Sequence, residues 1–189
     1  MIIGISGKKG SGKTFIARKL AAELNAPVLS FASPLKEIVR KCCGLTEEVP
    51  KETLITIVAD LVAVLPEFDA EILSKIEAAI GGTYGLSLQR VGTEVFRKID
   101  ENYWVKLAKK RAADYPICIF DDCRFPNEAV ILDHIVRVRG PPIDDSRDIS
   151  HSSEVAMDDF PFNYYIDNDG KTDSYVKQYE EFKASISLA

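Results

Sequence analysis

The stretch GKKGSGKT, from Gly7 to Thr14, decides the fold class of this chain. It matches the pattern G-x-x-x-x-G-K-[ST], in which glycines let backbone N–H groups turn inward around a polyphosphate. The short apolar run IIGIS (2–6) precedes it, and the helical pattern FIARKLAAELN (15–25) follows it. Strand, loop and helix therefore stand in the order that the motif requires, and the N-terminus of the helix adds partial positive charge.

The loop residues divide the expected work of binding ATP and Mg²⁺ between them. Lys13 is expected to reach the β- and γ-phosphates, and the Thr14 hydroxyl is expected to bind Mg²⁺. Partition-type ATPases have an early loop lysine at about the place of Lys8, but their loop has glycine where this chain has Lys9. We therefore expect Lys8 and Lys9 to face solvent. The phosphate contacts are expected from Gly10, Ser11, Gly12, Lys13 and Thr14.

Apolar runs of strand length alternate with helical patterns along the rest of the chain. The strand candidates are PVLSFA (27–32), PICIFDD (116–122), IVRVR (135–139) and the start of NYYIDNDG (163–170). Strands separated by helices indicate an α/β fold, with a parallel sheet that carries helices on both faces. The chain has 189 residues, the size of one domain, so we predict a single domain over 1–189.

Composition argues against several other classes of protein. The net charge of −5 does not suit a sequence-independent nucleic-acid binder, although a small anionic ligand needs only a local positive pocket. We see no signal peptide, and the most apolar region (54–66) is interrupted by Asp60 and too short to span a bilayer. We expect a cytoplasmic protein without nucleic-acid or membrane partners. The four cysteines form no CxxC pair, and we expect free thiols.

A second charged motif follows the clearest strand, where ICIF leads into DDCR (121–124). Ligands of parallel sheets gather at the carboxyl ends of the strands. An aspartate there can hold the water shell of Mg²⁺, and only one of Asp121 and Asp122 is expected to face the phosphates, because neighbouring strand residues point to opposite faces. Arg124 can grip a phosphate with two parallel hydrogen bonds. We take Asp121 as the metal ligand and all three residues as catalytic candidates.

The segment GPPIDDSRDISHSSE (140–154) is rich in Pro, Asp, Ser and Arg and is a candidate lid. Arg139 and Arg147 lie beside it or in it and could close over the triphosphate, although surface arginines are common. His151 lies in a helix-start pattern, and we favour a capping role for it over a functional one.

Taken in order, several segments resemble phage-type deoxynucleoside monophosphate kinases, within the nucleoside-monophosphate-kinase-like branch of P-loop proteins. These segments are GKKGSGKT, SFASPLK, QRVGTEVFRKIDENYW, DDCRFPNEA, HSSE and the terminal YYIDNDG. The chain lacks the D-G-F-P-R segment of ordinary adenylate kinases. The resemblance implies transfer of the ATP γ-phosphoryl group to a deoxynucleoside monophosphate and a nucleoside monophosphate kinase-like fold. The helical insertion 44–83 is the part that the resemblance matches least, and an acceptor cover and a homodimer contact are its open roles.

The resemblance also implies roles for individual residues. Lys36, Arg97 and Arg124 would grip the acceptor phosphate. The segment expected to face the acceptor's base or sugar contains Gln89, Thr93, Glu94 and Trp104. A solvated helix face is an equal alternative for Gln89 and Glu94, and core packing is the favoured alternative for Trp104. Asn168 and Gly170 would cup the adenine of ATP, although N-D-G is by itself a turn signal.

Two other functions stay open. The acceptor could be another small phosphorylated metabolite, such as phosphomevalonate or dephospho-coenzyme A. The chain could also be a regulatory or partition ATPase, which Lys8 suggests and which would hydrolyse ATP slowly without a small acceptor.

Overall fold

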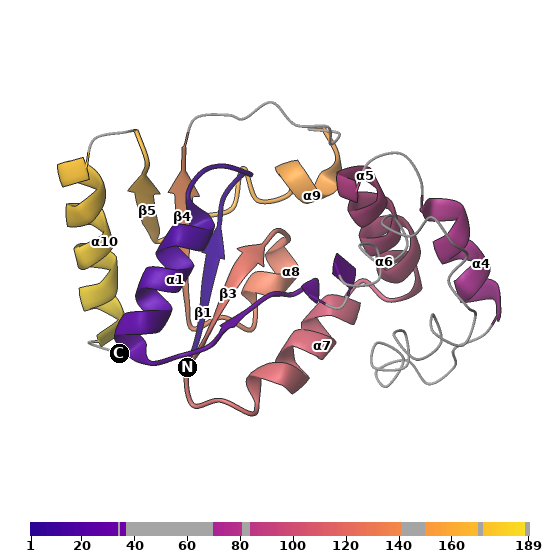
Figure 1. Cartoon of the computed structure of the whole chain (residues 1–189), viewed down its shortest axis with the longest axis horizontal. Coiled ribbons are helices and arrows are strands. Elements are labelled where there is room, and N and C mark those ends of the chain that lie inside the picture. The colour runs from indigo at the N-terminus through magenta and orange to yellow at the C-terminus, as the bar shows by residue number, and fades with distance from the viewer. Residues whose placement is uncertain (34, 37–69, 81–83, 141–149, 170–171, 188–189) are drawn as a thin grey trace.

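The computed structural model describes residues 1–33, 35–36, 70–80, 84–140, 150–169 and 172–187. Within them, five strands form one sheet in the order β2-β3-β1-β4-β5 (Figure 1). The strands are β1 (Ile2–Ser6), β2 (Val28–Leu29), β3 (Cys118–Cys123), β4 (His134–Arg139) and β5 (Tyr164–Asp167). Every pairing is parallel, so the predicted α/β fold with a parallel sheet is confirmed.

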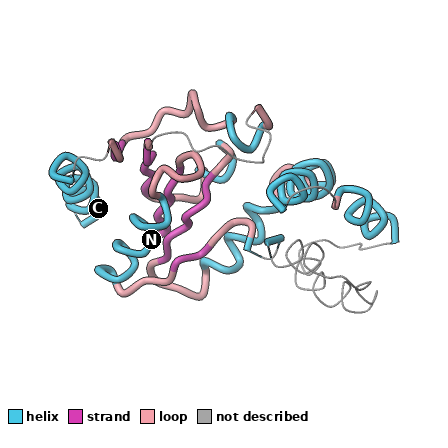
Figure 2. The backbone as a smooth tube through the Cα atoms, turned by 45° about the horizontal axis from the view of Figure 1, so that its top comes forward, coloured by secondary structure: helices cyan, strands magenta, loops and turns pink. Residues whose placement is uncertain are grey.

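Helices cover both faces of this sheet, as Figures 1 and 2 show. The described helices are α1 (Lys13–Leu24), α4 (Ala70–Ala79), α5 (Tyr84–Gln89), the π-helix η1 (Arg90–Phe96), α6 (Arg97–Ile99), α7 (Tyr103–Ala112), α8 (Pro126–Ala129), α9 (Ser152–Val155) and α10 (Thr172–Ser187). Helices α4 to α6 stand beside the sheet, beyond β3 in Figure 1.

The sheet separates two apolar clusters because its central strands are buried on both sides. On one face, α1 and α10 pack on alternate residues of the strands, including Ile3, Ile5, Ile119, Val136, Val138 and Ile166. On the other face, α7 and η1 pack on Leu29, Cys118, Phe120 and Cys123. The second cluster joins the helices beside the sheet to the sheet itself, which brings η1 and α6 close to the end of β3.

A β-bulge interrupts the pairing of β1 with β3. Gly4 pairs with Phe120 and Ser6 with Cys123, so β3 uses one residue more than β1 over this stretch. A bulge re-aims the side chains that it contains. Phe120 and Cys123 consequently pack in the same cluster, although simple alternation would place them on opposite faces. The extra residue falls at Asp121 and Asp122, the acidic pair that the sequence singles out.

The segment LSLQRVGTEVFRKID (86–100) is helical as expected, but its middle is a π-helix. Such segments are rare and leave main-chain groups for partners outside the helix. Here the Gly92 carbonyl oxygen accepts a hydrogen bond from Trp104 Nε1, 3.0 Å away. The bond fixes the indole of α7 against η1.

The structure describes only part of the helical insertion and of the lid candidate that the sequence predicts. In the insertion 44–83, residues 70–79 form α4, and Ile72 and Ile76 pack in the same cluster as η1. Residues 44–69 and 81–83, and most of the lid candidate with Arg147, lie outside the described residues. Cys118 and Cys123 are buried free thiols, as expected. No helix in the described part of the chain is long and apolar enough to cross a membrane.

Candidate active site

The loop between β1 and α1 has a backbone that only glycine adopts easily. Gly7, Gly10 and Gly12 have φ values of 145°, 79° and 103°. A Cβ at Gly7 would lie 2.3 Å from the Val138 carbonyl oxygen, so no side chain fits there. Gly12 caps α1 in the left-handed conformation. The N-terminus of a helix directs its first N–H groups toward an anion, and in α1 the N–H groups of Phe15 and Ile16 already donate to the Gly12 carbonyl oxygen.

Side chains of the loop fit a polyphosphate as well. Ser11 is buried, and within the described residues its Oγ has no hydrogen-bond partner. A buried hydroxyl without a partner costs free energy, which a phosphate oxygen would recover. Lys13 Nζ donates to the Lys8 carbonyl oxygen at 2.6 Å, across the loop, and Thr14 is exposed in the first turn of α1. The structure brings the predicted residues Gly10, Ser11, Gly12, Lys13 and Thr14 together around one loop.

Asn168 follows β5 and contacts this loop directly. Its backbone N–H donates to the Arg139 carbonyl oxygen at 2.7 Å, and its side-chain Nδ2 donates to the Ser11 carbonyl oxygen at 3.0 Å. A Cβ at Gly12 would lie 3.0 Å from the same Nδ2. The turn predicted to cup adenine therefore supports the phosphate loop, whereas its other predicted residue, Gly170, lies outside the described residues.

The two neighbouring aspartates at the end of β3, Asp121 and Asp122, have different surroundings. Asp122 is buried and accepts hydrogen bonds from the Ser30 hydroxyl, from Phe31 N–H at 2.7 Å and from Lys36 Nζ at 3.0 Å. Burial raises the pKa of Asp122, but Lys36 and these hydrogen bonds outweigh it, so the pKa lies below its ordinary value. Asp122 thus ties β3 to the segment after β2.

The charges of Lys36 and of the loop lysine Lys13 both act on Asp121. Burial and the neighbouring Asp122 raise its pKa, while the charges of Lys36 and Lys13 lower it, leaving it above the ordinary value. Of the two aspartates, Asp121 is the one whose pKa is lowered by the charge of the loop lysine Lys13. In the described part of the chain, no three His, Cys, Asp or Glu side chains form a cation site. Thr14 and Asp121 would hold Mg²⁺ together with phosphate and water oxygens, as Mg²⁺ commonly binds beside phosphates.

One cavity near the end of β3 gathers most of the residues predicted to bind an acceptor. It is lined by Lys36, Gln89, Thr93, Arg97, Trp104 and Arg124. We call it the acceptor cavity. Glu94 is not part of this lining and is exposed, because successive residues of a helix point in different directions. The position of Glu94 favours the solvated helix face over the acceptor-facing role. Trp104 packs in the core and also lines the cavity.

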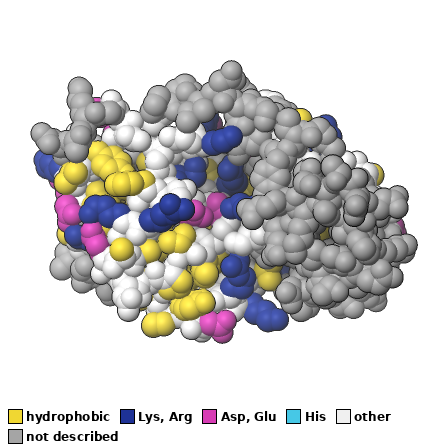
Figure 3. Space-filling model, viewed as in Figure 1, with side chains coloured by type: hydrophobic (Ala, Val, Ile, Leu, Met, Phe, Trp, Pro, Cys, Tyr) yellow, Lys and Arg dark blue, Asp and Glu magenta, His cyan; other side chains and the backbone are white. Residues whose placement is uncertain are grey.

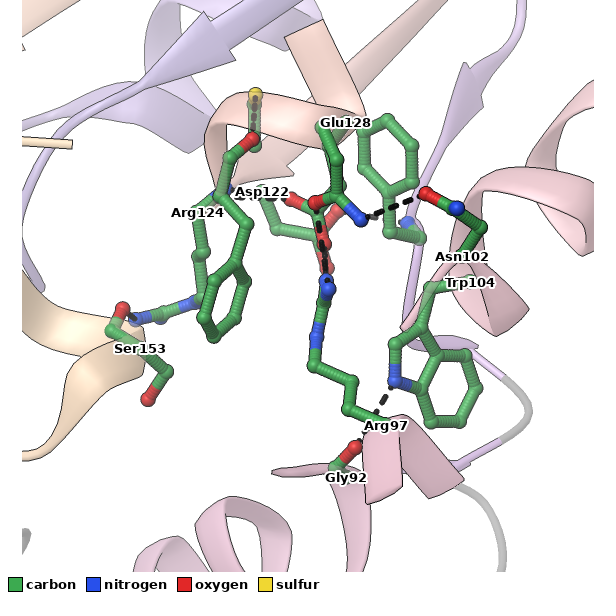
Figure 4. A network of polar contacts seen from close by, with 12 residues as sticks. Gly92, Arg97, Asn102, Trp104, Asp122, Arg124, Glu128 and Ser153 are labelled. Atoms are coloured by element: carbon green, nitrogen blue, oxygen red, sulfur yellow. Dashed lines mark hydrogen bonds and ion pairs between the residues drawn. The ribbon is translucent and has the colours of Figure 1, made fainter. Parts of the chain in front are cut away.

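Arg97 reaches from α6 to Glu128 of α8, a residue that the sequence analysis did not single out. The two side chains form a buried ion pair, with 8% and 4% of their surfaces exposed. Arg97 Nη1 also donates to the Glu101 carbonyl oxygen at 3.0 Å and to Asn127 Oδ1 at 3.3 Å. The guanidinium lies over the ring of Phe125, 3.7 Å from its centroid. Figure 4 shows Arg97 extending toward Glu128 with Trp104 beside it.

Arg124 extends in another direction, toward α9. Its Nη1 donates to Glu154 at 2.6 Å and to the Ser153 carbonyl oxygen at 3.2 Å, as Figure 4 shows for Ser153. His151 caps α9, with Nδ1 accepting from Ser153 N–H at 3.2 Å, so the favoured structural role of His151 is observed. Arg124, Ser153 and Glu154 line the acceptor cavity.

A small cavity borders both the acceptor cavity and the phosphate loop, and we call it the passage. It is lined on one side by Arg124, Ser153 and Glu154, which also line the acceptor cavity, and on the other by Gly7 and Lys8 of the loop. Arg137 of β4 lies in this passage and donates from Nη1 to Ser6 Oγ at 3.1 Å. On the face in Figure 3, Lys and Arg side chains gather around the middle of the molecule.

The sequence pattern did not single out Arg137. Asp158 bridges Arg137 and Lys8, at 3.0 Å from Lys8 Nζ and 2.7 Å from Arg137 Nη2. Lys8 is exposed, as expected, and its ammonium also pairs with Asp158 across 150 positions of sequence. The alternation of IVRVR could have revealed Arg137: Val136 and Val138 pack under α1 and α10, so Arg137 must point to the other face.

Arg139 lies at the end of β4, beside a further cavity of about 410 Å³ that Lys8 and Arg137 also line. Its guanidinium forms two hydrogen bonds with Asp167, at 2.6 and 2.9 Å, and lies 4.5 Å from the centroid of the Tyr165 ring. The hydrogen bonds to Asp167 raise the pKa of Arg139. Arg139 is thus held beside the phosphate loop.

A parallel sheet with a glycine-rich phosphate loop between β1 and α1 defines the P-loop NTPase fold. No family model matches the sequence, and no curated protein matches it. Among solved structures, TT1252 from Thermus thermophilus superposes with a TM-score of 0.48 and 14% identity, over 100% of this chain and 97% of that one. Shikimate kinase from Bacteroides thetaiotaomicron superposes with a TM-score of 0.47 and 13% identity, over 99% and 98%. The function has to be argued from the site.

Proposed function

We propose that this protein transfers the γ-phosphoryl group of ATP to the phosphate of a deoxynucleoside monophosphate. The observation that carries this proposal is the passage between the two sites. Arg124 borders both the acceptor cavity and the passage that reaches Gly7 and Lys8 of the phosphate loop. A phosphate held at Arg124 would therefore lie next to the terminal phosphate of ATP, which phosphoryl transfer requires.

The walls of the acceptor cavity favour a nucleotide over a small polar metabolite. Three cationic side chains, of Lys36, Arg97 and Arg124, line it together with the carboxylates of Asp122, Glu128 and Glu154. Its apolar and aromatic lining comes from Phe31, Leu35, Leu88, Trp104 and Phe125. An acceptor with one anionic end and one flat, weakly polar end satisfies both parts. The resemblance of the sequence to deoxynucleoside monophosphate kinases supports the choice of a deoxynucleotide.

The reaction needs positioning and positive charge more than covalent help from the protein. An oxygen of the acceptor phosphate attacks the γ-phosphorus, a new P–O bond forms, the bond to the β–γ bridging oxygen breaks, and ADP leaves. The acceptor phosphate is already ionised, so no side-chain base has to remove a proton. Lys13, Arg124 and Arg137 would neutralise the charge in transit. Bound Mg²⁺, held through Thr14 and Asp121, would supply further positive charge to the phosphates.

The test is a coupled ADP-release assay with Mg²⁺-ATP and each of dAMP, dCMP, dGMP, dTMP and their ribo forms. We expect release that requires a deoxynucleotide and is lost in Lys13→Ala and Arg97→Ala, with Arg18→Ala, on the exposed face of α1, as the control. ADP release that ignores every acceptor would replace the proposal with a regulatory ATPase. ATP binding without release would point to another phosphorylated metabolite.

A further inference from the structure

Glu128 occupies an unusual position for a carboxylate at the acceptor cavity. It is 3% exposed and lies at the third position of α8, where its carboxylate accepts from the N–H of the N-cap residue Phe125. Its Oε2 accepts hydrogen bonds from Arg124 N–H at 2.7 Å and Phe125 N–H at 3.1 Å. Its Oε1 pairs with Arg97. One carboxylate thus joins the end of β3, the start of α8 and the helix α6.

The capping contacts alone do not require a buried charge at this position. A neutral oxygen satisfies helix N–H groups, and buried ion pairs add little stability compared with apolar packing. Burial raises the pKa of Glu128 to about 7, so ionising this carboxyl carries an appreciable cost. A negative charge beside an anion site also repels the ligand unless a cation neutralises it. A role in the site explains these features better than capping does.

Both groups that Glu128 holds belong to the acceptor cavity. Arg97 is held from three sides: by Glu128, by the Glu101 carbonyl and Asn127, and by the Phe125 ring. Arg124 is held at its backbone, immediately before α8 begins. The side chain of Arg124 then extends toward Glu154 of α9 and borders both the acceptor cavity and the passage.

We infer that Glu128 is a positioning residue of the acceptor site, which holds the guanidinium of Arg97 and the backbone of Arg124 where the two arginines can bind the acceptor phosphate. The inference rests on the proposed function, since it assumes a phosphorylated acceptor. Glu128 itself does not contact the reacting atoms. Its effect on the ligand passes through the two arginines.

The sole tryptophan, Trp104, lines the acceptor cavity and allows binding there to be followed by intrinsic fluorescence. The probes are inorganic phosphate and the nucleoside monophosphates, and ATP affinity is measured separately by calorimetry. The variant is Glu128→Gln, which keeps the shape and one capping acceptor but removes the charge. The matched control is Glu23→Gln, which removes a carboxylate that pairs with Lys19 and Lys183 between α1 and α10.

We expect Glu128→Gln to weaken phosphate and monophosphate binding about tenfold or more, because the charged partner of Arg97 is lost. ATP affinity should change less than about twofold, and Glu23→Gln should leave both affinities unchanged. In an Arg97→Gln background, Glu128→Gln should have a much smaller effect on phosphate affinity, since the two residues act as a unit. A purely structural role would give equal losses in both backgrounds.

Two results would overturn the inference: a folded Glu128→Gln protein that binds phosphate as tightly as the wild type, or one that loses ATP and phosphate affinity equally. Absence of a phosphate-induced change in Trp104 fluorescence in the wild type would overturn it as well. Failure of the proposed function looks different. In that case the wild type would bind phosphate and depend on Glu128, yet release no ADP with any nucleoside monophosphate.

Discussion

The side-chain amide of Asn168 donates a hydrogen bond to the Ser11 carbonyl oxygen at 3.0 Å, which links the turn after β5 to the centre of the phosphate loop. The two residues are 157 positions apart in sequence. Ser11 also contributes the buried hydroxyl that fits a phosphate oxygen. The shape of the loop therefore depends on the last strand of the sheet as well as on its own glycines.

Asn168→Ala should consequently weaken ATP binding. One hydrogen bond contributes about 1 kcal/mol, which corresponds to roughly a fivefold loss of affinity. Acceptor affinity, followed by Trp104 fluorescence, should not change. The control is Gln178→Ala, which removes a hydrogen bond to Asp167 N–H next to this turn but none to the loop. Equal ATP affinities in Asn168→Ala and wild type, measured by calorimetry, would show that the link has no function.

Arg137→Gln should reduce turnover without weakening binding of either substrate. Arg137 lies in the passage between the two sites, where charge develops during transfer, and its side chain is only 12% exposed. Loss of one stabilising donor in such a position typically lowers kcat by roughly 10²-fold. Steady-state kinetics should show a lower kcat with nearly constant KM values for both substrates. A large rise in either KM with unchanged kcat would instead make Arg137 a ground-state binding residue.

Because of Glu128, the free energy of unfolding should fall as pH rises, whereas acceptor affinity should rise. The pKa of Glu128 in the folded protein, about 7, lies above the ordinary glutamate value of 4.5. The folded state therefore holds the proton more tightly, so this contribution stabilises the protein fully below about pH 4.5 and is lost as pH rises through about 7. Burial is the main cause, Asp122 adds to it, and Arg97 and the N–H groups of Arg124 and Phe125 oppose it.

The two pH effects can be measured with the same pair of proteins. In urea unfolding, the free energy of unfolding of the wild type relative to Glu128→Gln should fall by about 3 kcal/mol between pH 4.5 and pH 8. Acceptor affinity of the wild type, again relative to Glu128→Gln, should rise over the same range, because ionised Glu128 pairs with Arg97. If wild type and Glu128→Gln show the same pH dependence of unfolding free energy and of acceptor affinity, both expectations are contradicted.

Gly92→Ala should narrow the acceptor cavity without unfolding the protein. An added Cβ would lie 2.8 Å from Leu35 Cδ2, the far end of a flexible side chain that lines the cavity. Leu35 would have to move, and a misfit of one methyl group in a binding pocket costs roughly tenfold in affinity. The double variant Gly92→Ala/Leu35→Val should restore binding. Failure of the double variant to do so, in the fluorescence titration, would exclude Leu35 as the cause.

Much of the fold follows from local sequence pattern, because strand, loop and helix signals act over a few residues. The phosphate loop and the strands β1, β3, β4 and β5 lie close to where the pattern predicts them. The strand predicted at 27–32 is shorter, since pairing with β3 extends only over Val28 and Leu29. The π-helix and the β-bulge were not predicted, because both arise from packing against other elements rather than from local preference.

The sequence by itself determined which residues carry the chemistry of the loop: the glycines with positive φ, Lys13 and the strand and helix on either side of them. The tertiary structure alone decided which charges work together. Glu128 pairs with Arg97 across 31 positions, and Asp158 joins Lys8 to Arg137. A buried charge is tolerated only beside a partner of opposite sign, and folding, not spacing along the chain, brings those partners within reach.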